Sequence, residues 1–316
     1  MAESGTDIIK AAALLKAGEL VAIPTETVYG LAGNALNLSS VTKIFQVKGR
    51  PQFDPLIVHV PDFLAVGDYA TNIPEQAKVL AKHFWPGPLT LLLPKKDVIP
   101  DLVTSGLDSV GLRCPDHPLT NQLLRNLPFP VAAPSANPFG YVSPTRPEHV
   151  EEQLGNKIAY ILDGGPCNVG VESTIVGFEN GTPRILRLGG ITQEEIESVI
   201  GKVEAHTHST SNPKAPGQLQ SHYAPRKKLI LGNLEDLIEE YSAKTVDILS
   251  FQKDFHSISQ FILSPNGQLD EAAKNLFAAL RALDKLPGEI ILAELVPDVG
   301  LGRAINDRLR RAAGSR

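Results

Sequence analysis

The sequence is poor in cysteine, since Cys114 and Cys167 are the only two among 316 residues. Two thiols cannot supply the four ligands of a structural zinc site by themselves, and no Cys-x-x-Cys pair occurs. Without a sign of secretion, two reduced thiols are expected rather than a disulfide. The cysteine content therefore indicates a protein of a reducing compartment.

Long apolar runs are also missing, because no stretch approaches the roughly 20 residues that cross a bilayer. The first residues, Met-Ala-Glu-Ser-Gly, lack the basic and apolar regions of a signal peptide. Lys and Arg number 30 against 35 Asp and Glu, giving a net charge of −5. Bulk charge therefore indicates neither a nucleic-acid nor a membrane binder. We expect a cytoplasmic protein without a membrane partner, in which any anion site is a local cluster.

Three nucleotide or nucleophile motifs are absent as well. The sequence contains no Gly-x-x-x-x-Gly-Lys-Ser/Thr loop, no Gly-x-Gly-x-x-Gly and no Gly-x-Ser-x-Gly elbow. A chain of this length, with 42% hydrophobic and 21% charged residues, is an ordinary globular composition and suggests two domains.

The pattern along the chain predicts an α/β protein of two units. Residues 1–201 mix short strands, helices and Pro/Gly turns at irregular spacing, which predicts a twisted mixed sheet with helices on its faces. Residues 202–225 have the polar, turn-rich composition of a linker. In residues 226–316, strands and helices alternate, which predicts a smaller parallel, Rossmann-like sheet.

Periodicity and capping signals place the individual elements. The predicted helices are 6–17 with Thr6 as its cap, 39–47, 74–84, one capped by Thr145, one begun at Thr192 with Glu195 in a capping box, 234–241, 269–283 and 301–313. The predicted strands are 19–23, 56–60, 89–93, 110–113, 131–133, 158–162, 173–177, 184–188, 228–231, 246–250 and 290–293.

Two cations, Lys48 and Arg50, flank Gly49 just after a helical run. In an extended segment they would project to the same side, and Gly49 would let the backbone approach an anion. The alternative is two surface cations at a helix C-terminus, where the dipole favours them. The apolar strand 56–60 that follows favours a phosphate site. His59 in that strand is either a hydrogen-bonded core histidine or part of the site.

Polar side chains also follow several other predicted strands. They are Thr25, Thr27, Arg113, Ser135, Asn137, Ser143, Ser173 and Arg187. A capped turn or, for Arg113, a structural ion pair would explain each one alone. Open α/β sheets bind ligands at such strand ends, so the set together predicts a polyanionic ligand that also carries a small polar group.

The last predicted helix is rich in arginine, with Arg303, Arg308, Arg310 and Arg311. We interpret these residues as a solvated basic face, and contact with tRNA is the less favoured alternative. His206 and His208 lie two apart in the linker and are interpreted as free surface histidines rather than metal ligands.

The order of these motifs resembles the YrdC-type threonylcarbamoyl-AMP synthases. The similar segments are Pro24-Thr25-Glu26-Thr27-Val28-Tyr29-Gly30-Leu31, Lys48-Gly49-Arg50-Pro51, Pro55-Leu56-Ile57-Val58-His59, Trp85-Pro86-Gly87-Pro88-Leu89-Thr90, Arg113-Cys114-Pro115, Pro134-Ser135-Ala136-Asn137 and Glu172-Ser173-Thr174-Ile175. The family's Lys-x-Arg and Ser-x-Asn signature corresponds to Lys48, Arg50, Ser135 and Asn137. The tail resembles the long form of the family through Pro216-Gly217, His222-Tyr223-Ala224-Pro225 and residues 300–309.

The resemblance implies an activity and a domain plan. L-threonine, bicarbonate and ATP would give L-threonylcarbamoyladenylate and pyrophosphate, and the product would feed threonylcarbamoyladenosine modification of tRNA. The chain would consist of a YrdC-like catalytic domain at 1–201, a linker that serves as a lid at 202–225 and a Rossmann-like domain at 226–316. Magnesium would be bound with ATP. A transient contact with tRNA or with a tRNA-threonylcarbamoyl transferase is a further expectation.

The resemblance also implies residue roles. Lys48 and Arg50 would be catalytic, and the contacts to L-threonine would be Thr27, His59, Arg113, Ala133 and Ser173. The contacts to ATP would be Arg50, Asp54, Ser109, Ser135, Asn137, Ser143, Arg187 and Tyr223. Asp54 departs from the asparagine that is frequent in the family, and a carboxylate near phosphates is electrostatically unusual.

A different class of function is a non-catalytic RNA-binding module with a basic concave surface. That alternative explains Lys48 and Arg50. It does not explain the hydroxyl groups that accompany Arg113, so the enzyme is the favoured interpretation.

Overall fold

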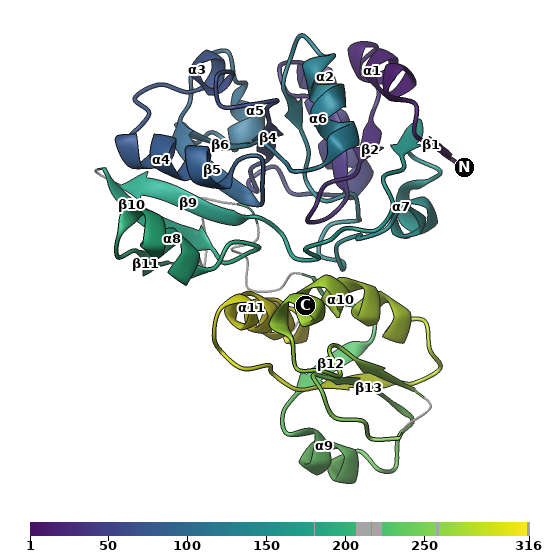
Figure 1. Ribbon diagram of the computed structural model, residues 1–316. Helices are drawn as coiled ribbons and strands as arrows, with labels where there is room; N and C mark the ends of the chain where they lie inside the picture. The colour runs from purple at the N-terminus through teal and green to yellow at the C-terminus, as the bar shows by residue number, and fades with distance from the viewer. Residues whose placement is uncertain (180, 207–215, 217–222, 257–258, 315–316) are drawn as a thin grey trace.

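The computed structural model describes residues 1–179, 181–206, 216, 223–256 and 259–314 (Figure 1). The strands of the first unit are β1 (Glu3–Gly5), β2 (Val21–Ile23), β3 (Gly30–Asn34), β4 (Ile57–His59), β5 (Leu89–Pro94), β6 (Ser109–Arg113), β7 (Val131–Ala132), β8 (Tyr160–Leu162), β9 (Thr174–Glu179), β10 (Thr182–Arg187) and β11 (Glu204–Ala205). Its helices are α1 (Ile8–Lys16), α2 (Leu38–Lys48), α3 (Val66–Tyr69), α4 (Glu75–Phe84), α5 (Asp101–Thr104), α6 (Pro118–Arg125), α7 (Pro147–Leu154) and α8 (Gln193–Ile200).

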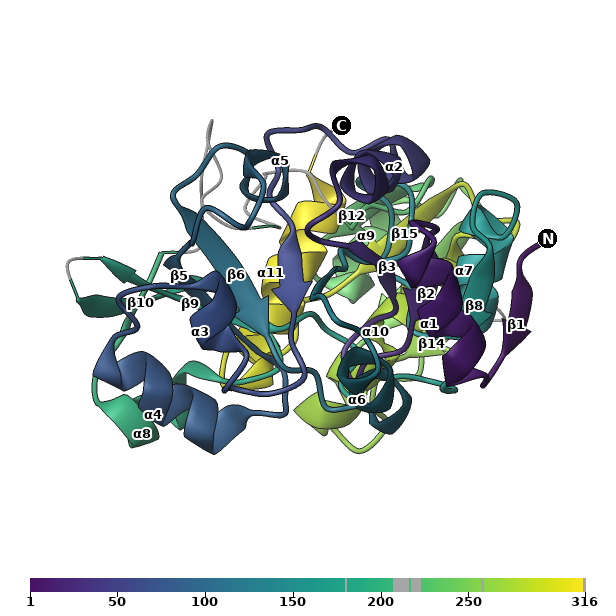
Figure 2. The same cartoon turned by 90° about the horizontal axis from the view of Figure 1, so that it is seen from above.

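These strands form one mixed sheet in the order β1-β8-β2-β3-β7-β4-β6-β5-β9-β10-β11. The sheet contains both parallel pairs, such as β4 with β6, and antiparallel pairs, such as β5 with β6. Helices cover both faces, since Val21 and Ile23 of β2 pack with α1 and α6, whereas Ala22 between them packs with α2. Figure 2 shows α1 and α2 on opposite sides of β2 and β3.

The second sheet consists of β12 (Lys228–Leu231), β13 (Val246–Ser250), β14 (Gln260–Ile262) and β15 (Ile290–Ala293). Its order is β12-β15-β13-β14, and every pair is parallel. Ile290 and Leu292 pack with α9 (Leu234–Glu240), and Ile291 packs on the other face with α10 (Leu269–Leu283) and α11 (Leu301–Ala313). Helices α10 and α11 lie between this sheet and the first unit (Figure 1). The predicted fold class is confirmed.

The second unit packs directly on the first through apolar and polar contacts. Val28, Val142 and Val171 belong to the same buried cluster as α10 and α11. The Arg281 side chain of α10 donates to the carbonyl oxygens of Val142 and Ser143. The two units therefore share one interface core.

Two predicted helix caps are wrong. The carboxylate of Asp7, rather than the hydroxyl of Thr6, caps α1 by accepting from the amide of Lys10. Helix α7 begins after Arg146, so Thr145 does not cap it. The Thr145 amide instead donates to Nδ1 of His149 at 3.2 Å. At α8 the predicted capping box of Thr192 and Glu195 is confirmed.

The predicted linker, 202–225, is described only at 202–206, 216 and 223–225. Strand β11 lies at its start and pairs with β10, so the first sheet continues past residue 201. The remainder of the linker, with His208 and the predicted lid, lies outside the described residues. The domain bounds stay a prediction.

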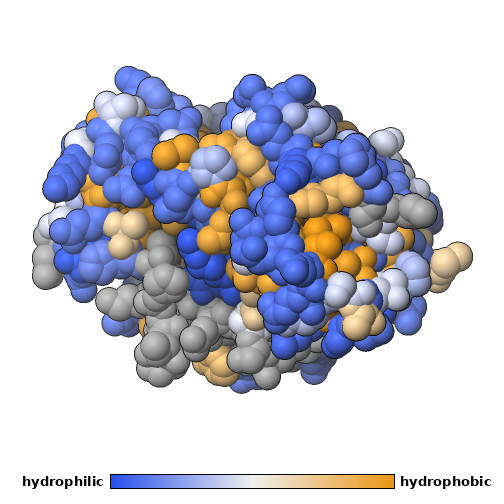
Figure 3. All heavy atoms as spheres, turned by 90° about the horizontal axis from the view of Figure 1, so that it is seen from below, coloured by the Kyte–Doolittle hydropathy of each residue, from blue (hydrophilic) through white to orange (hydrophobic). Residues whose placement is uncertain are grey.

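The face seen from below in Figure 3 is covered mainly by hydrophilic side chains, with a few apolar groups between them. In the described part of the chain, no helix has the length and apolar character that crossing a membrane requires.

Candidate active site

A pocket lies where several strand ends of the first sheet meet the linker. Nine residues predicted from the sequence line it, namely Thr25, Arg50, His59, Arg113, Ala133, Ser135, Ser173, Arg187 and Tyr223. The other lining residues are Val28, Gly30, Pro55, Ile57, Pro134, Glu172 and Pro216. Residues between positions 25 and 223 thus line one cavity. This agrees with the prediction that polar side chains at the ends of several strands form one ligand site.

Other predicted residues lie outside this lining. Among the described residues, the lining does not include Thr27, Lys48, Asp54, Asn137 or Ser143, all of which are buried. Ser109 lines a small neighbouring pocket, which shares Pro55, Ile57 and Pro216 with the main one. The substrate contacts proposed for these residues stay predictions.

His59 and Arg113 are neighbours because β4 and β6 pair in register at these residues. The Arg113 guanidinium forms a buried ion pair with Glu26, with 2.7 Å between Nη2 and Oε1. Burial and then the nearby Arg113 charge lower the pKa of His59 to about 3. At neutral pH the pocket therefore holds a neutral imidazole beside a charged guanidinium.

The turn that precedes β3 is fixed by its own hydroxyl groups. Thr25 Oγ1 donates to the carbonyl oxygen of Val28 at 2.6 Å and lies 2.8 Å from Thr27 Oγ1. Such side-chain bonds stabilise a turn locally. They leave Thr25 at the cavity wall and Thr27 buried behind it.

Lys48 and Arg50 are not on an extended segment, so the premise for a shared direction is wrong. Lys48 is the last residue of α2, and Gly49 ends the helix in the left-handed conformation at φ 62°. The Lys48 ammonium donates to the carbonyl oxygens of Ser135 and, at 2.6 Å, Asn137. Burial and then the Arg50 charge hold the pKa of Lys48 well below its usual range. In this structure Lys48 holds the 134–138 loop.

Arg50 lines the pocket and is paired with Asp54, at 3.0 Å between Nη2 and Oδ2. Arg50 also donates to the carbonyl oxygens of Asp54 and Pro55. Burial raises the pKa of the Asp54 carboxyl, and the Arg50 and Lys48 charges oppose that shift. The charge of the Asp54 carboxylate is thus balanced by its ion pair with Arg50, and Asp54 itself is not among the residues that line the pocket.

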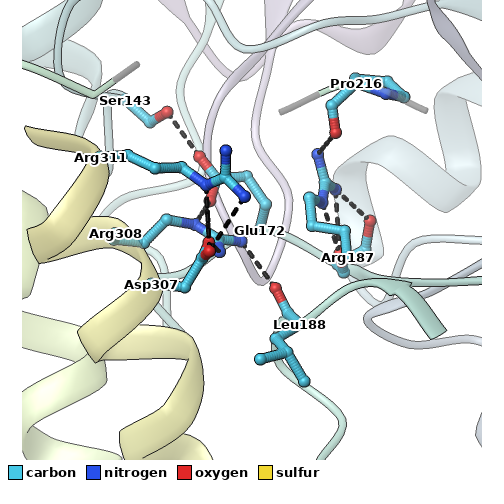
Figure 4. Close-up of polar contacts among 9 residues, drawn as sticks. Ser143, Glu172, Arg187, Leu188, Pro216, Asp307, Arg308 and Arg311 are labelled. Atoms are coloured by element: carbon cyan, nitrogen blue, oxygen red, sulfur yellow. Dashed lines mark hydrogen bonds and ion pairs between the residues drawn. The ribbon is translucent and has the colours of Figure 1, made fainter. Parts of the chain in front are cut away.

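Arg187 joins the sheet to the linker (Figure 4). Its Nε and Nη2 donate to the Ser173 carbonyl oxygen at 3.0 and 2.9 Å, and Nη1 donates to the Pro216 carbonyl oxygen at 3.2 Å. The Ser173 hydroxyl is shared between Arg187 Nη2 at 3.0 Å and Thr90 Oγ1 at 2.8 Å. Arg187 therefore fixes both the serine and the described end of the linker at the pocket.

Sequence reasoning missed Glu172 and Arg308. Glu172 lines the pocket, and its Oε2 accepts from Arg308 Nε of α11 at 2.9 Å. Arg308 and Arg311 are buried, so a solvated basic face is wrong for these two residues. The spacing of Ile305, Arg308 and Leu309 could have revealed this, because it places Arg308 on the apolar side of the helix.

Comparisons with known proteins cover nearly the whole chain. Residues 13–189 match the Sua5, YciO and YrdC family model described as "Telomere recombination". Residues 191–314 match the model described as "Threonylcarbamoyl-AMP synthase, C-terminal domain".

Full-length relatives agree with these matches. The chain is 44% identical to the threonylcarbamoyl-AMP synthase of Bacillus subtilis (strain 168), with 98% of this chain and 93% of the relative covered. It is 43% identical to the synthase of Pyrococcus abyssi (strain GE5 / Orsay), with 97% and 94% covered. The crystal structure of P. abyssi Sua5 complexed with L-threonine superposes with a TM-score of 0.94 at 41% identity, covering 99% of this chain and 97% of that one.

Proposed function

Since the chain belongs to the threonylcarbamoyl-AMP synthase family, we propose that it converts L-threonine, bicarbonate and ATP into L-threonylcarbamoyladenylate and pyrophosphate. It is an enzyme of the nucleotidyltransferase type. The pocket supports this assignment because its lining contains Arg113 and the imidazole of His59 together with two further arginines, Arg50 and Arg187.

The observation that carries the proposal is a set of buried polar atoms without partners. Arg113 Nε makes no hydrogen bond to any described residue, and Arg113 Nη2 has only the ion pair with Glu26. His59 Nδ1 has no hydrogen bond of normal geometry among the described residues, and the imidazole interacts only with the Ile57 backbone beside the Arg113 charge. An unpaired buried group costs about 1–3 kcal/mol unless a ligand satisfies it. An amino acid brings a carboxylate for Arg113 and, in threonine, a hydroxyl for the neutral His59 imidazole.

The nucleotide half of the reaction requires positive charge and no covalent nucleophile. Threonine nitrogen bonds to the carbon of bicarbonate while the bond from that carbon to its hydroxyl breaks, and the hydroxyl leaves as water with a proton from the amine. A carboxylate oxygen of the resulting carbamate then attacks the α-phosphorus of ATP. The bond from that phosphorus to the bridging oxygen breaks, and pyrophosphate leaves with the electron pair. Arg50 and Arg187 would stabilise the charge that develops on the phosphates.

ATP would enter as its magnesium complex. The carboxylate of Glu172, which lines the pocket, already accepts from Ser143 and Arg308, and Asp54 is paired with Arg50. Phosphate oxygens would then supply the ligands of the ion, and no step depends on a protein ligand. Magnesium would neutralise part of the phosphate charge.

The product is a mixed anhydride, so a transferase must consume it, and a transient contact with tRNA or that transferase is part of the proposal. We also place the protein in the cytoplasm, which fits its two buried free thiols. The RNA-binding alternative explains the cations but gives no role to the unpaired atoms around His59 and Arg113.

The test is incubation with ATP, magnesium and bicarbonate together with a panel of amino acids, followed by mass spectrometry of the adenylates. We expect pyrophosphate release and an adenylate with threonine. Serine and valine should be poorer substrates, since each lacks one group that the pocket matches. Equal turnover of valine would refute the threonine pocket, and RNA binding without any adenylate would favour the alternative.

A further inference from the structure

Glu172 places a carboxylate in the wall of a pocket that should admit a polyphosphate. The side chain is buried and lies in the cavity lining with Arg187. An uncompensated negative charge in such surroundings would repel the phosphates and would itself be costly to bury. The carboxylate therefore needs a counter-charge before an anionic ligand can enter.

The counter-charge comes from the second unit. Glu172 Oε1 accepts from the hydroxyl of Ser143 at 2.7 Å, and Oε2 accepts from Arg308 Nε at 2.9 Å. Figure 4 shows Arg308 reaching from α11 to Glu172. Both carboxylate oxygens are thus engaged, one of them by an ion pair with the C-terminal helix.

Arg308 is itself held in one geometry. Its side chain is fully buried, Nη1 donates to Asp307 Oδ2 at 2.6 Å, and Nη2 donates to the Leu188 carbonyl oxygen at 2.8 Å. The guanidinium also lies over the Tyr223 ring, 5.1 Å from its centroid. A second contact to Tyr223 comes from Phe277 of α10, which stacks on it with 5.6 Å between ring centroids.

We propose that Arg308 is a positioning residue for the nucleotide: it neutralises Glu172 and, with Phe277, holds Tyr223 against the pocket. The second unit thereby completes the site for ATP rather than only stabilising the fold. This inference rests on the proposed function, because it takes ATP as the polyanionic ligand. Ligand binding provides a readout that does not depend on turnover.

The experiment compares the wild type with Arg308→Gln, Glu172→Gln and the double variant in the full chain. Calorimetric titration with ATP and, separately, with L-threonine gives the affinities, and adenylate assays give KM and kcat. We expect Arg308→Gln to weaken ATP binding about tenfold or more, as expected when one partner of a buried charge pair is removed. Threonine affinity should change less than about twofold, because among the described residues the hydrogen bonds of Arg308 and of the Glu172 carboxylate go to Ser143, Asp307, Leu188 and each other, and not to His59 or Arg113.

The double variant distinguishes this role from a purely structural one. Glu172→Gln in the Arg308→Gln background removes the unpaired negative charge, so most of the ATP affinity should return. Lys227→Met is the matched control, since the partly buried Lys227 forms an ion pair with the buried Asp247 within the second unit, 2.6 Å apart, and lies outside the pocket lining. It should lower the midpoint of thermal unfolding without changing the ratio of the two affinities.

The proposal is overturned if Arg308→Gln weakens ATP and threonine binding equally, or if the double variant binds ATP no better than Arg308→Gln. Should Arg308→Gln not fold, Arg308→Lys takes its place: it keeps a charge beside Glu172 but loses the planar group over Tyr223, so ATP binding should weaken while threonine binding stays within about twofold, and an equal loss of both would again overturn the proposal. A wild type that binds ATP but makes no adenylate would refute the proposed function while leaving this comparison intact.

Discussion

At the scale of single residues, His59 and Arg113 are neighbours in the pocket, yet one side chain is neutral and the other is positively charged. Arg113 stays charged beside Glu26, whereas burial and the Arg113 charge keep His59 neutral. A neutral imidazole has one donor and one acceptor nitrogen, so it can serve a substrate hydroxyl in either direction. The charge of this part of the pocket is balanced before the substrate carboxylate arrives.

The neutral state of His59 has a consequence for stability in acid. Its pKa is about 3 in the folded protein and about 6.5 when unfolded, so the unfolded chain takes up the proton first. Stability is therefore complete above pH 6.5 and falls as the pH drops toward 3. We expect His59→Gln to flatten urea-derived unfolding free energies over pH 7 to 4 by up to about 1.4 kcal/mol per pH unit.

The matched control is His256→Gln, because His256 is largely exposed, with 88% of its side chain accessible. Its profile should follow the wild type. If His59→Gln also follows the wild type, the buried neutral imidazole does not contribute to the acid sensitivity.

Arg113 is a second case at this scale. Lysine keeps the charge but loses the planar group that binds a carboxylate through two parallel bonds. We expect Arg113→Lys to lower kcat/KM for threonine by about 10- to 100-fold, equivalent to about 1.4–2.7 kcal/mol. The KM for ATP should stay near the wild-type value. An equal loss for both substrates would contradict a specific role with the amino acid.

At the scale of elements, the end of α2 supports a loop that is distant in sequence. Lys48 donates to the carbonyl oxygens of Ser135 and Asn137. Lys48→Met keeps the length of the side chain but leaves these two buried acceptors unpaired. We expect the unfolding free energy of the ligand-free protein to fall by about 1–3 kcal/mol, from urea titration. Unchanged stability with lost activity would instead support direct contact with phosphate.

Elements with a strong local signal were predicted most closely. The bounds of α10, α11, β12, β13 and β15 are confirmed, because apolar periodicity and flanking turns define them locally.

Other elements depend on distant partners. Strand β3 reads Gly-Leu-Ala-Gly-Asn, a composition with low strand propensity, and it forms because β2 and β7 pair on either side. The exposed strand β1 was missed as well, and it pairs with β8. No local pattern carries that information.

The same distinction applies to the site. Arg50, His59 and Arg113 could be selected because each is polar at a predicted strand end or turn. The role of Arg308 could not, because it depends on Glu172, which is 136 positions away in the sequence. Contacts of this kind follow from tertiary packing.

At the scale of the whole molecule, the interface between the two units is polar as well as apolar. Tyr141 donates to Asp284 at 2.7 Å, and Lys285 forms an ion pair with Glu152. Arg281 donates to the carbonyl oxygens of Val142 and Ser143 and to Gln153 Oε1. These bonds and the shared apolar cluster should make the two units unfold together.

We therefore expect one calorimetric transition for the wild type. Arg281→Ala leaves buried carbonyl groups unpaired, so stability should fall by about 1–3 kcal/mol and the transition should broaden or divide. Lys285→Ala, at an exposed ion pair, is the matched control and should change stability by less than about 1 kcal/mol. Two separate transitions in the wild type would contradict the shared core.

The strand order of the first sheet also constrains how the chain is made. Strands β2 and β3 form one group and β4, β6 and β5 another, and β7 joins them with only Val131 and Ala132. On the ribosome, the first 130 residues therefore emerge as two sheet fragments with open edges, which are sites of wrong pairing between chains. Strand β9 covers the open edge of β5 later still, and β10 and β11 follow it. A pause in translation before residue 131 would leave these fragments exposed, and unpaired strand edges of this kind favour aggregation.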